Sequence, residues 1–203
     1  MTIEVFADVV CPFTHVGLRR LTDRRDRSGS TASVRVRAWP LELVNGEPLP
    51  VGLVAEEVEE LRKHAAPDLF VGFDPTTFPS SALPALALAA AAYRSDDQLG
   101  ERVSLALRHA LFEQGRDVAS DEVLADVARR HGVPRVGPSD HDRVLADWHE
   151  GERRSVRGSP HYFVGGDDFF CPALEIKHVD GRLRIDADPI GFDRFVERAL
   201  DAA

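Results

Sequence analysis

The chain has 203 residues, of which 43% are hydrophobic, so it can form one well-packed core and carry an inserted subdomain. Its formal net charge of -9 argues against non-specific binding to nucleic acid or to anionic membranes. No apolar run reaches the roughly 18 residues that suggest a membrane-spanning helix.

The N-terminal residues, MTIEVFADVV, lack the basic and apolar segments and the cleavage site of a secretory signal. We therefore expect a cytoplasmic protein. Because thiols stay reduced in that compartment, the two cysteines, Cys11 and Cys171, are not expected to form a structural disulfide.

The first elements predict a β-α-β unit. In residues 2–10 polar and apolar residues first alternate and the run then becomes continuously apolar, which predicts an interior strand. Pro12 suits the first position of a helix that ends at Gly29, and residues 33–38 predict a second strand. Two strands joined in this way should be parallel, with a right-handed crossover.

Residues 51–156 have a helical pattern and no strand signal, so we predict an all-helical insertion domain there. In its second helix Ser80 or Ser81 is the expected cap, and Pro84 is expected in the first turn.

Strand signals return after residue 157. Two aromatic runs flank Gly165-Gly166-Asp167-Asp168, which predicts a hairpin, and residues 174–186 predict another that turns at Asp180-Gly181. An amphipathic helix ends the chain. Residues 1–50 and 157–203 therefore form one α/β domain of β-α-β and β-β-α parts around the insertion.

Cys11 stands where the first strand gives way to the helix. The unpaired N–H groups and the dipole of a helix N-terminus favour the thiolate, and such sites lower a thiol pKa from about 8.5 to roughly 3.5–7.5. Thr14 lies near enough for its hydroxyl to donate to the sulfur. A buried, unreactive cysteine is the alternative that the local sequence leaves open.

Pro160, in GSPHYF, stands at the entrance of the third strand, a position that proline tolerates. Four segments together resemble the DsbA-like branch of the thioredoxin superfamily, and within it the FrnE-like proteins and the mycothiol-dependent group near them. These segments are DVVCPFTHVG (8–17), RAWPLELVNGEPLP (37–50), LRHALFEQGRDVASDEVLADVARRHGV (107–133) and RGSPHYFVGG (157–166). The resemblance spans nearly the whole chain and implies a thioredoxin-like fold with a DsbA-type helical insertion.

The resemblance implies that Cys11, followed by Pro12, is the nucleophilic thiol. Pro160 would be a cis-proline packed against it, and Ser159 would present its backbone to a bound thiol. Thr14 stands where the family has its resolving cysteine, so the intramolecular exchange step is lost. We therefore expect a monothiol form of a DsbA-family thiol-disulfide oxidoreductase, which needs an external thiol to release a mixed disulfide.

The expected co-substrate is a low-molecular-weight thiol: glutathione, mycothiol or bacillithiol. Small-molecule disulfides or protein disulfides would be the substrates, no cofactor would be tightly bound, and the protein would be a monomer or a homodimer.

Two other functions stay open. Kappa-class glutathione transferases and hydroxychromene carboxylate isomerases also lack the cysteine pair and bind glutathione at this site, so a thiol transferase or isomerase is the second candidate. Those enzymes have serine at the nucleophile position, whereas this chain keeps Cys11. A redox-inactive relative that binds a ligand or partner in the groove is the third.

Three roles are open for Cys171. A hairpin turning at Gly165-Gly166 places Cys171 opposite Pro160, two strand spacings, or about 9–10 Å, from Cys11. A disulfide needs Cα atoms about 4.4–6.8 Å apart, so a direct bond would require movement. Cys171 could resolve a mixed disulfide, contact a bound thiol, or only pack.

Further candidates could border the groove. His15 could stabilise the thiolate or act as an acid, or be a plain surface histidine. Arg157, with its neighbours Arg153 and Arg154, could recognise an anionic thiol or carboxylate, or only solvate a helix end. The other candidates for the groove wall are Phe13, Trp39 and His161. The histidine spacing and the absence of a Cys-x-x-Cys pair predict no metal site.

Overall fold

The computed structural model describes residues 2–180 and 182–200. Its strands are β1 Thr2–Ala7, β2 Ser33–Ala38, β3 His161–Val164, β4 Asp167–Phe170, β5 Leu174–Val179 and β6 Arg182–Ala187. Its helices are α1 Pro12–Ser28, α2 Leu41–Asn45, α3 Val51–His64, α4 Leu83–Ser95, α5 Asp97–Phe112, α6 Asp121–His131, α7 Pro138–Arg153 and α8 Pro189–Leu200, with a 3-10 turn at Pro75–Thr77.

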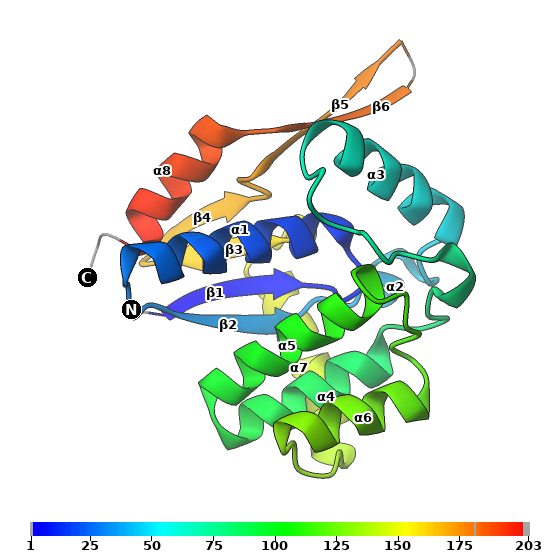
Figure 1. Cartoon of the computed structure of the whole chain (residues 1–203). Coiled ribbons are helices and arrows are strands. Elements are labelled where there is room, and N and C mark those ends of the chain that lie inside the picture. The colour runs from blue at the N-terminus through cyan, green and yellow to red at the C-terminus, as the bar shows by residue number, and fades with distance from the viewer. Residues whose placement is uncertain (1, 181, 201–203) are drawn as a thin grey trace.

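Four strands form one sheet in the order β2-β1-β3-β4, with β1 parallel to β2 and antiparallel to β3. The predicted β-α-β unit with an interior first strand is therefore confirmed. Helices α1 and α8 pack on one face of the sheet, where Leu18, Leu21 and Phe195 join a buried cluster with Ile3 and Val5. The helices α4 to α7 gather beside β2, and α7 also packs against that strand (Figure 1).

The β3–β4 hairpin has the predicted register, with His161 opposite Phe170 and Val164 opposite Asp167. The second predicted hairpin is also present, but β5 and β6 form a two-stranded sheet of their own. It projects beside α3, and β6 packs against that helix (Figure 1). Asp180 has a positive φ of 51° at the turn, while Gly181 lies outside the described residues.

Helix α4 begins at Leu83, with Ala82 as its N-cap residue, so the prediction of Ser80 or Ser81 as the cap is wrong. The hydroxyl of Ser81 still accepts the N–H of Leu83 at 3.2 Å, while the Glu42 carboxylate accepts the N–H of Ala82 at 2.7 Å. Pro84 lies in the first turn as predicted. The carboxylate of Glu42, on α2, therefore shares the start of α4 with the hydroxyl of Ser81.

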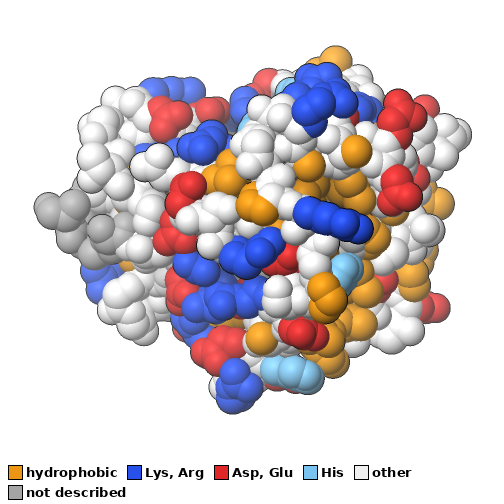
Figure 2. Space-filling view, turned by 90° about the horizontal axis from the view of Figure 1, so that it is seen from below, with side chains coloured by type: hydrophobic (Ala, Val, Ile, Leu, Met, Phe, Trp, Pro, Cys, Tyr) orange, Lys and Arg blue, Asp and Glu red, His pale blue; other side chains and the backbone are white. Residues whose placement is uncertain are grey.

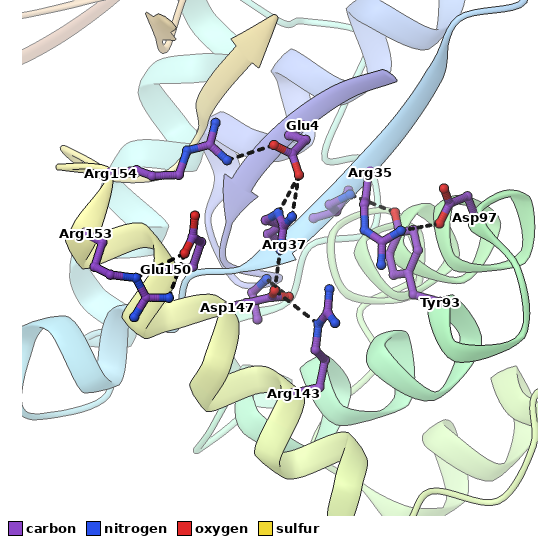
Figure 3. Close-up of polar contacts among 12 residues, drawn as sticks. Glu4, Arg35, Arg37, Tyr93, Asp97, Arg143, Asp147, Glu150, Arg153 and Arg154 are labelled. Atoms are coloured by element: carbon purple, nitrogen blue, oxygen red, sulfur yellow. Dashed lines mark hydrogen bonds and ion pairs between the residues drawn. The ribbon is translucent and has the colours of Figure 1, made fainter. Parts of the chain in front are cut away.

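A chain of alternating charges joins the sheet to α7 (Figure 3). Glu4 of β1 binds Arg154 at 2.8 Å and Arg37 of β2 at 2.6 Å. Arg37 also binds Asp147 of α7 at 2.9 Å, and Asp147 in turn binds Arg143 at 3.2 Å. Because Arg37 is half-buried, its ion pairs are less exposed to solvent than a pair on the surface.

The underside of the molecule, formed by the helical region, carries hydrophobic side chains flanked by charges of both signs (Figure 2). A groove of about 540 Å³ between α4 and α6 is lined by Leu88, Leu124 and Val136, among others. None of the described helices is long and apolar enough to cross a membrane.

Candidate thiol site

Cys11 is the N-cap residue of α1, with extended backbone angles, and Pro12 begins the helix. Its side chain is only 3% exposed. The sulfur lies 3.1 Å from the carbonyl oxygen of Ser159, to which the thiol donates. Residues separated by nearly 150 positions are thus joined at one point, where the first helix meets the third strand.

The Ser159–Pro160 peptide bond is cis. The hydroxyl oxygen of Ser159 accepts the N–H of Asp8 at 2.9 Å and lies 2.8 Å from the hydroxyl oxygen of Thr14. Thr14 is fully buried. The residue in place of a second cysteine therefore binds the loop that carries Pro160.

Asp8 organises this site, although the sequence-based candidates did not include it. Its carboxylate accepts the N–H of Val10 at 3.1 Å and that of Leu41 at 2.6 Å, and its carbonyl oxygen accepts the buried guanidinium of Arg108 at 3.0 Å. Burial raises the pKa of Asp8 to about 6, although these backbone hydrogen bonds oppose the change. Its place in the Asp-x-x-Cys stretch was the signal that could have identified it.

Burial also raises the pKa of the Cys11 thiol above its ordinary value. Contacts with the side chain of Ser159 and with Thr14 act in the opposite direction, and the carboxylate of Glu57 on α3 raises the pKa further. The hydrogen bond from the thiol to the Ser159 carbonyl is available only to the protonated form. The prediction of a lowered pKa is therefore wrong for this closed site, because desolvation outweighs the helix N-terminus.

The charge of Glu57, on α3, acts on the thiol from the helical region. Its side chain is half-buried, and burial raises its own pKa to about 7. Near neutral pH this carboxyl is therefore partly protonated, and its influence on Cys11 changes within that range.

His15 is buried, so the alternative of a surface histidine is wrong. Its ring lies between Phe70 and Phe112, with centroid distances of 5.3 and 5.0 Å, and its Nε2 is 2.6 Å from the carboxylate of Glu113. Burial lowers the pKa of His15, although Glu113 opposes this change. The neutral ring donates its Nε2–H to Glu113, so that proton is already engaged by a carboxylate.

Glu113 also accepts the N–H groups of Phe70 and Val71, at 2.9 and 3.2 Å. Burial alone would raise its pKa, but the bonds from His15 and from these two N–H groups lower it to about 2. The carboxylate thereby holds Phe70 in a left-handed conformation, with φ of 65°.

Cys171 directly follows β4, and its N–H donates to the carbonyl oxygen of Pro160 at 3.0 Å. The predicted position opposite Pro160 is confirmed. Cys171 is buried and, like Cys11, is a free thiol. Burial and the proximity of Cys11 raise the pKa of Cys171. Its role in resolving a disulfide or in binding a thiol stays a prediction.

His161 is buried, with both ring nitrogens engaged. Nδ1 accepts the N–H of Arg157 at 3.2 Å, so Nε2 carries the proton and donates to Asp168 at 2.7 Å. The exposed guanidinium of Arg157 binds the same carboxylate at 3.0 Å and lies over the ring of Phe170. These contacts fix the outer strand of the hairpin next to the thiol site.

The other arginines before the loop are also paired. Arg153 binds Glu150 and Arg154 binds Glu4 (Figure 3). Phe13 is half-buried against the larger apolar cluster. Trp39 is buried against Phe6, so it belongs to the core and does not line a groove.

Gly17 explains how α1 comes close to the third strand. A Cβ atom on Gly17 would lie 2.6 Å from the hydroxyl of the buried Tyr162 and 3.8 Å from Pro160. A side chain here would push the helix from the loop that bonds to Cys11. In the described part of the chain, no cluster of three His, Cys, Asp or Glu side chains could hold a metal ion.

The profile described as the DSBA-like thioredoxin domain matches residues 2–184. Cytosolic disulfide reductase DsbM from Pseudomonas aeruginosa has a TM-score of 0.62 and 17% identity, over 100% of both chains. A structure of the same protein with GSH has a TM-score of 0.58 and 16% identity, over 97% of this chain and 98% of that one. No curated protein sequence matches the chain.

A structure of 2-hydroxychromene-2-carboxylate isomerase is similar to the same extent. Its TM-score is 0.61 at 16% identity, over 84% of this chain and 88% of that one. At identities this low, the structural likeness shows the fold alone.

Proposed function

Because the chain belongs to the DSBA-like thioredoxin domain family, we propose that it is a thiol-disulfide oxidoreductase that acts through Cys11 as a monothiol. The observation that carries this proposal is the contact of the Cys11 sulfur with the Ser159 carbonyl at 3.1 Å, at the start of α1. A bound thiol or disulfide can replace this internal contact. The buried Thr14 leaves no second thiol within α1 to close on Cys11.

The proposed reaction has two exchange steps. The Cys11 thiolate attacks one sulfur of a disulfide, forms a mixed disulfide and releases the other half as a thiolate, which takes up a proton. The thiolate of a small external thiol then attacks the substrate-derived sulfur of the mixed disulfide. A new disulfide leaves, and Cys11 returns as a thiolate.

The first step requires the thiol proton to leave the Ser159 carbonyl. Because burial raises the pKa of Cys11, we propose that substrate binding opens the site and lets solvent or a released thiolate take that proton. The resting enzyme would then be protected from oxidation until a substrate arrives.

Glutathione, mycothiol or bacillithiol is the proposed co-substrate, and the similarity to DsbM, whose structure has been solved with GSH, supports a thiol of this kind. A cytoplasmic location is part of the same proposal, since DsbM is a cytosolic disulfide reductase. Small-molecule or protein disulfides remain the proposed substrates.

Intact-mass measurement of the protein after incubation with glutathione disulfide tests the proposal. We expect one glutathione adduct on the wild type and on Cys171→Ser, none on Cys11→Ser, and full release of the adduct by excess glutathione. Mycothiol and bacillithiol disulfides, used in parallel, would identify the preferred thiol. An internal disulfide between Cys11 and Cys171 in the monomer would contradict the monothiol cycle.

A thiol transferase or isomerase is the second candidate, and the protonated, buried thiol of Cys11 favours it. In that case glutathione binds without covalent exchange. The alkylation rate of Cys11 against pH, measured in Cys171→Ser with and without glutathione, separates the two candidates. Glutathione binding that protects Cys11 without any adduct would favour the isomerase, and no binding of any of the three thiols would favour a redox-inactive relative.

A further inference from the structure

A second concavity lies between α1, α5 and α6, and neither Cys11, Thr14 nor Ser159 lines it. Its volume is about 330 Å³, within the range of pockets that hold small molecules. We call it the arginine pocket because it is lined by Arg19 of α1, Arg102 of α5, Arg130 of α6 and Arg116 of the α5–α6 connection.

The charge of the arginine pocket is opposite to that of the whole protein. Asp126 is the one carboxylate among its lining residues, against four guanidinium groups, whereas the chain has a formal net charge of -9. Guanidinium groups that line one concavity repel one another unless anions lie between them.

Asp126 cannot neutralise this charge, because it is shared among three arginines. Its carboxylate binds Arg116 at 2.9 Å, Arg130 at 2.9 Å and Arg129 at 2.6 Å. These bonds also fix the directions of the Arg116 and Arg130 guanidinium groups. The single carboxylate therefore organises the arginines and leaves an excess of positive charge.

The other two arginines of the pocket, Arg19 and Arg102, have no such partner among the described residues. Within residues 2–180 and 182–200, Arg19 and Arg102 make no ion pair and no side-chain hydrogen bond. Leu105, Ala110 and Val127 add apolar side chains to the same lining. This combination suits a molecule that carries several charged groups on a carbon skeleton.

We infer that the arginine pocket binds a small organic anion with two or more negative charges, carried by phosphoryl or carboxylate groups. Guanidinium groups pair with both kinds of oxyanion through two parallel N–H···O bonds. The inference does not depend on the proposed thiol chemistry, because the four arginines of the pocket take no part in the proposed exchange at Cys11.

Isothermal titration calorimetry at low ionic strength tests the inference, with pyrophosphate and citrate as the two probes. The variants are the double substitution Arg19→Gln with Arg102→Gln, and the matched control Arg62→Gln, whose exposed side chain lies on α3 outside the pocket. Circular dichroism of each variant verifies that it is folded.

We expect at least one probe to bind with a stoichiometry of one. The double variant should weaken binding by about 10-fold or more, since it removes two charge-assisted contacts to the anion, and Arg62→Gln should bind like the wild type. Tighter binding of pyrophosphate indicates a phosphoryl ligand, and tighter binding of citrate indicates a polycarboxylate.

Cys11→Ser should bind the probe as the wild type does, so a failure of the proposed thiol chemistry leaves this result unchanged. The inference is overturned if neither probe binds at millimolar concentration. Equal weakening by the double variant and by Arg62→Gln would also overturn it, because the effect would then reflect overall charge.

Discussion

The thiol site and the arginine pocket lie against the same helix, α1, yet they use polar groups in opposite ways. Around Cys11 the polar atoms of Ser159, Thr14 and Asp8 bind one another and exclude solvent. In the arginine pocket several cations share one carboxylate and face an open concavity. Directional hydrogen bonds and desolvation determine the properties of the thiol site, while unbalanced charge determines those of the arginine pocket.

The difference shows that a reactive group can be uncharged in the resting protein. Desolvation makes the Cys11 site neutral at rest, so its reactivity depends on opening. The pocket, by contrast, carries its charge permanently, since arginine does not lose its proton in proteins. His15 joins the two regions, because it follows Cys11 by one helical turn and also lines the arginine pocket.

Thr14→Cys should have the largest effect on the thiol site. In a Cys171→Ser background, mild oxidation with glutathione disulfide should convert the variant to a disulfide between positions 11 and 14, because both side chains meet at Ser159. Counting free thiols by mass spectrometry measures this conversion. Thr14→Ser is the control, and persistence of two free thiols in Thr14→Cys would show that the turn holds these positions apart.

Ser159→Ala should destabilise the protein by about 2 kcal/mol, because it leaves the buried N–H of Asp8 and the hydroxyl of Thr14 without their partner. Urea unfolding measures the difference. Ser139→Ala, at an exposed position in the first turn of α7, is the control. Equal stability of the two variants would mean that the hydrogen bonds of Ser159 add nothing to the stability of the site.

Glu113→Gln should have a smaller effect that depends on pH. The pKa of Glu113 is about 2 in the folded protein, below its ordinary 4.5, so its ionised form stabilises the fold above pH 4.5. This contribution disappears as the pH falls from 4.5 towards 2. The urea midpoints of the wild type and the variant should therefore differ most near neutral pH and converge in acid; a constant difference would contradict the assigned carboxylate.

Glu57→Gln should have the smallest effect, a change of a few-fold in the alkylation rate of Cys11. The Glu57 carboxylate raises the pKa of the Cys11 thiol, so its removal should lower that pKa and speed alkylation. Because the pKa of Glu57 is about 7, the difference should appear above pH 7 and vanish in more acidic solution. Glu59→Gln, exposed on the same helix, is the control; identical rates for both variants would place Glu57 too far from the sulfur to matter.

Local patterns predicted the parts of the fold that local residues determine. The family resemblance and the thioredoxin-like α/β class are confirmed by the match over residues 2–184. The glycine pair 165–166 gave the hairpin register and the position of Cys171, because a two-residue turn leaves strands little freedom. Pro12 and Gly29 marked the ends of α1 correctly.

The sequence could not reveal what depends on distant contacts. His15 has a local pattern compatible with exposure, and only the approach of Phe70 and Phe112 buries it. The prediction of a lowered pKa for Cys11 failed for the same reason. The position of Cys11 at the helix start is a local feature, whereas its desolvation comes from the surrounding segments. Glu113 acts through the backbone N–H groups of a distant segment, for which a sequence carries no direct mark.

The alternating chain from Arg154 through Glu4, Arg37 and Asp147 to Arg143 limits how this protein can be changed. Each inner member balances two neighbours, so a single neutral substitution leaves an excess charge on the ones that remain. An engineer who exchanges Glu4 must therefore also exchange an arginine beside it. Substitutions in this chain of ion pairs should therefore be tolerated in pairs of opposite charge. Libraries of single substitutions will underestimate how much variation the interface between α7 and the sheet can accept.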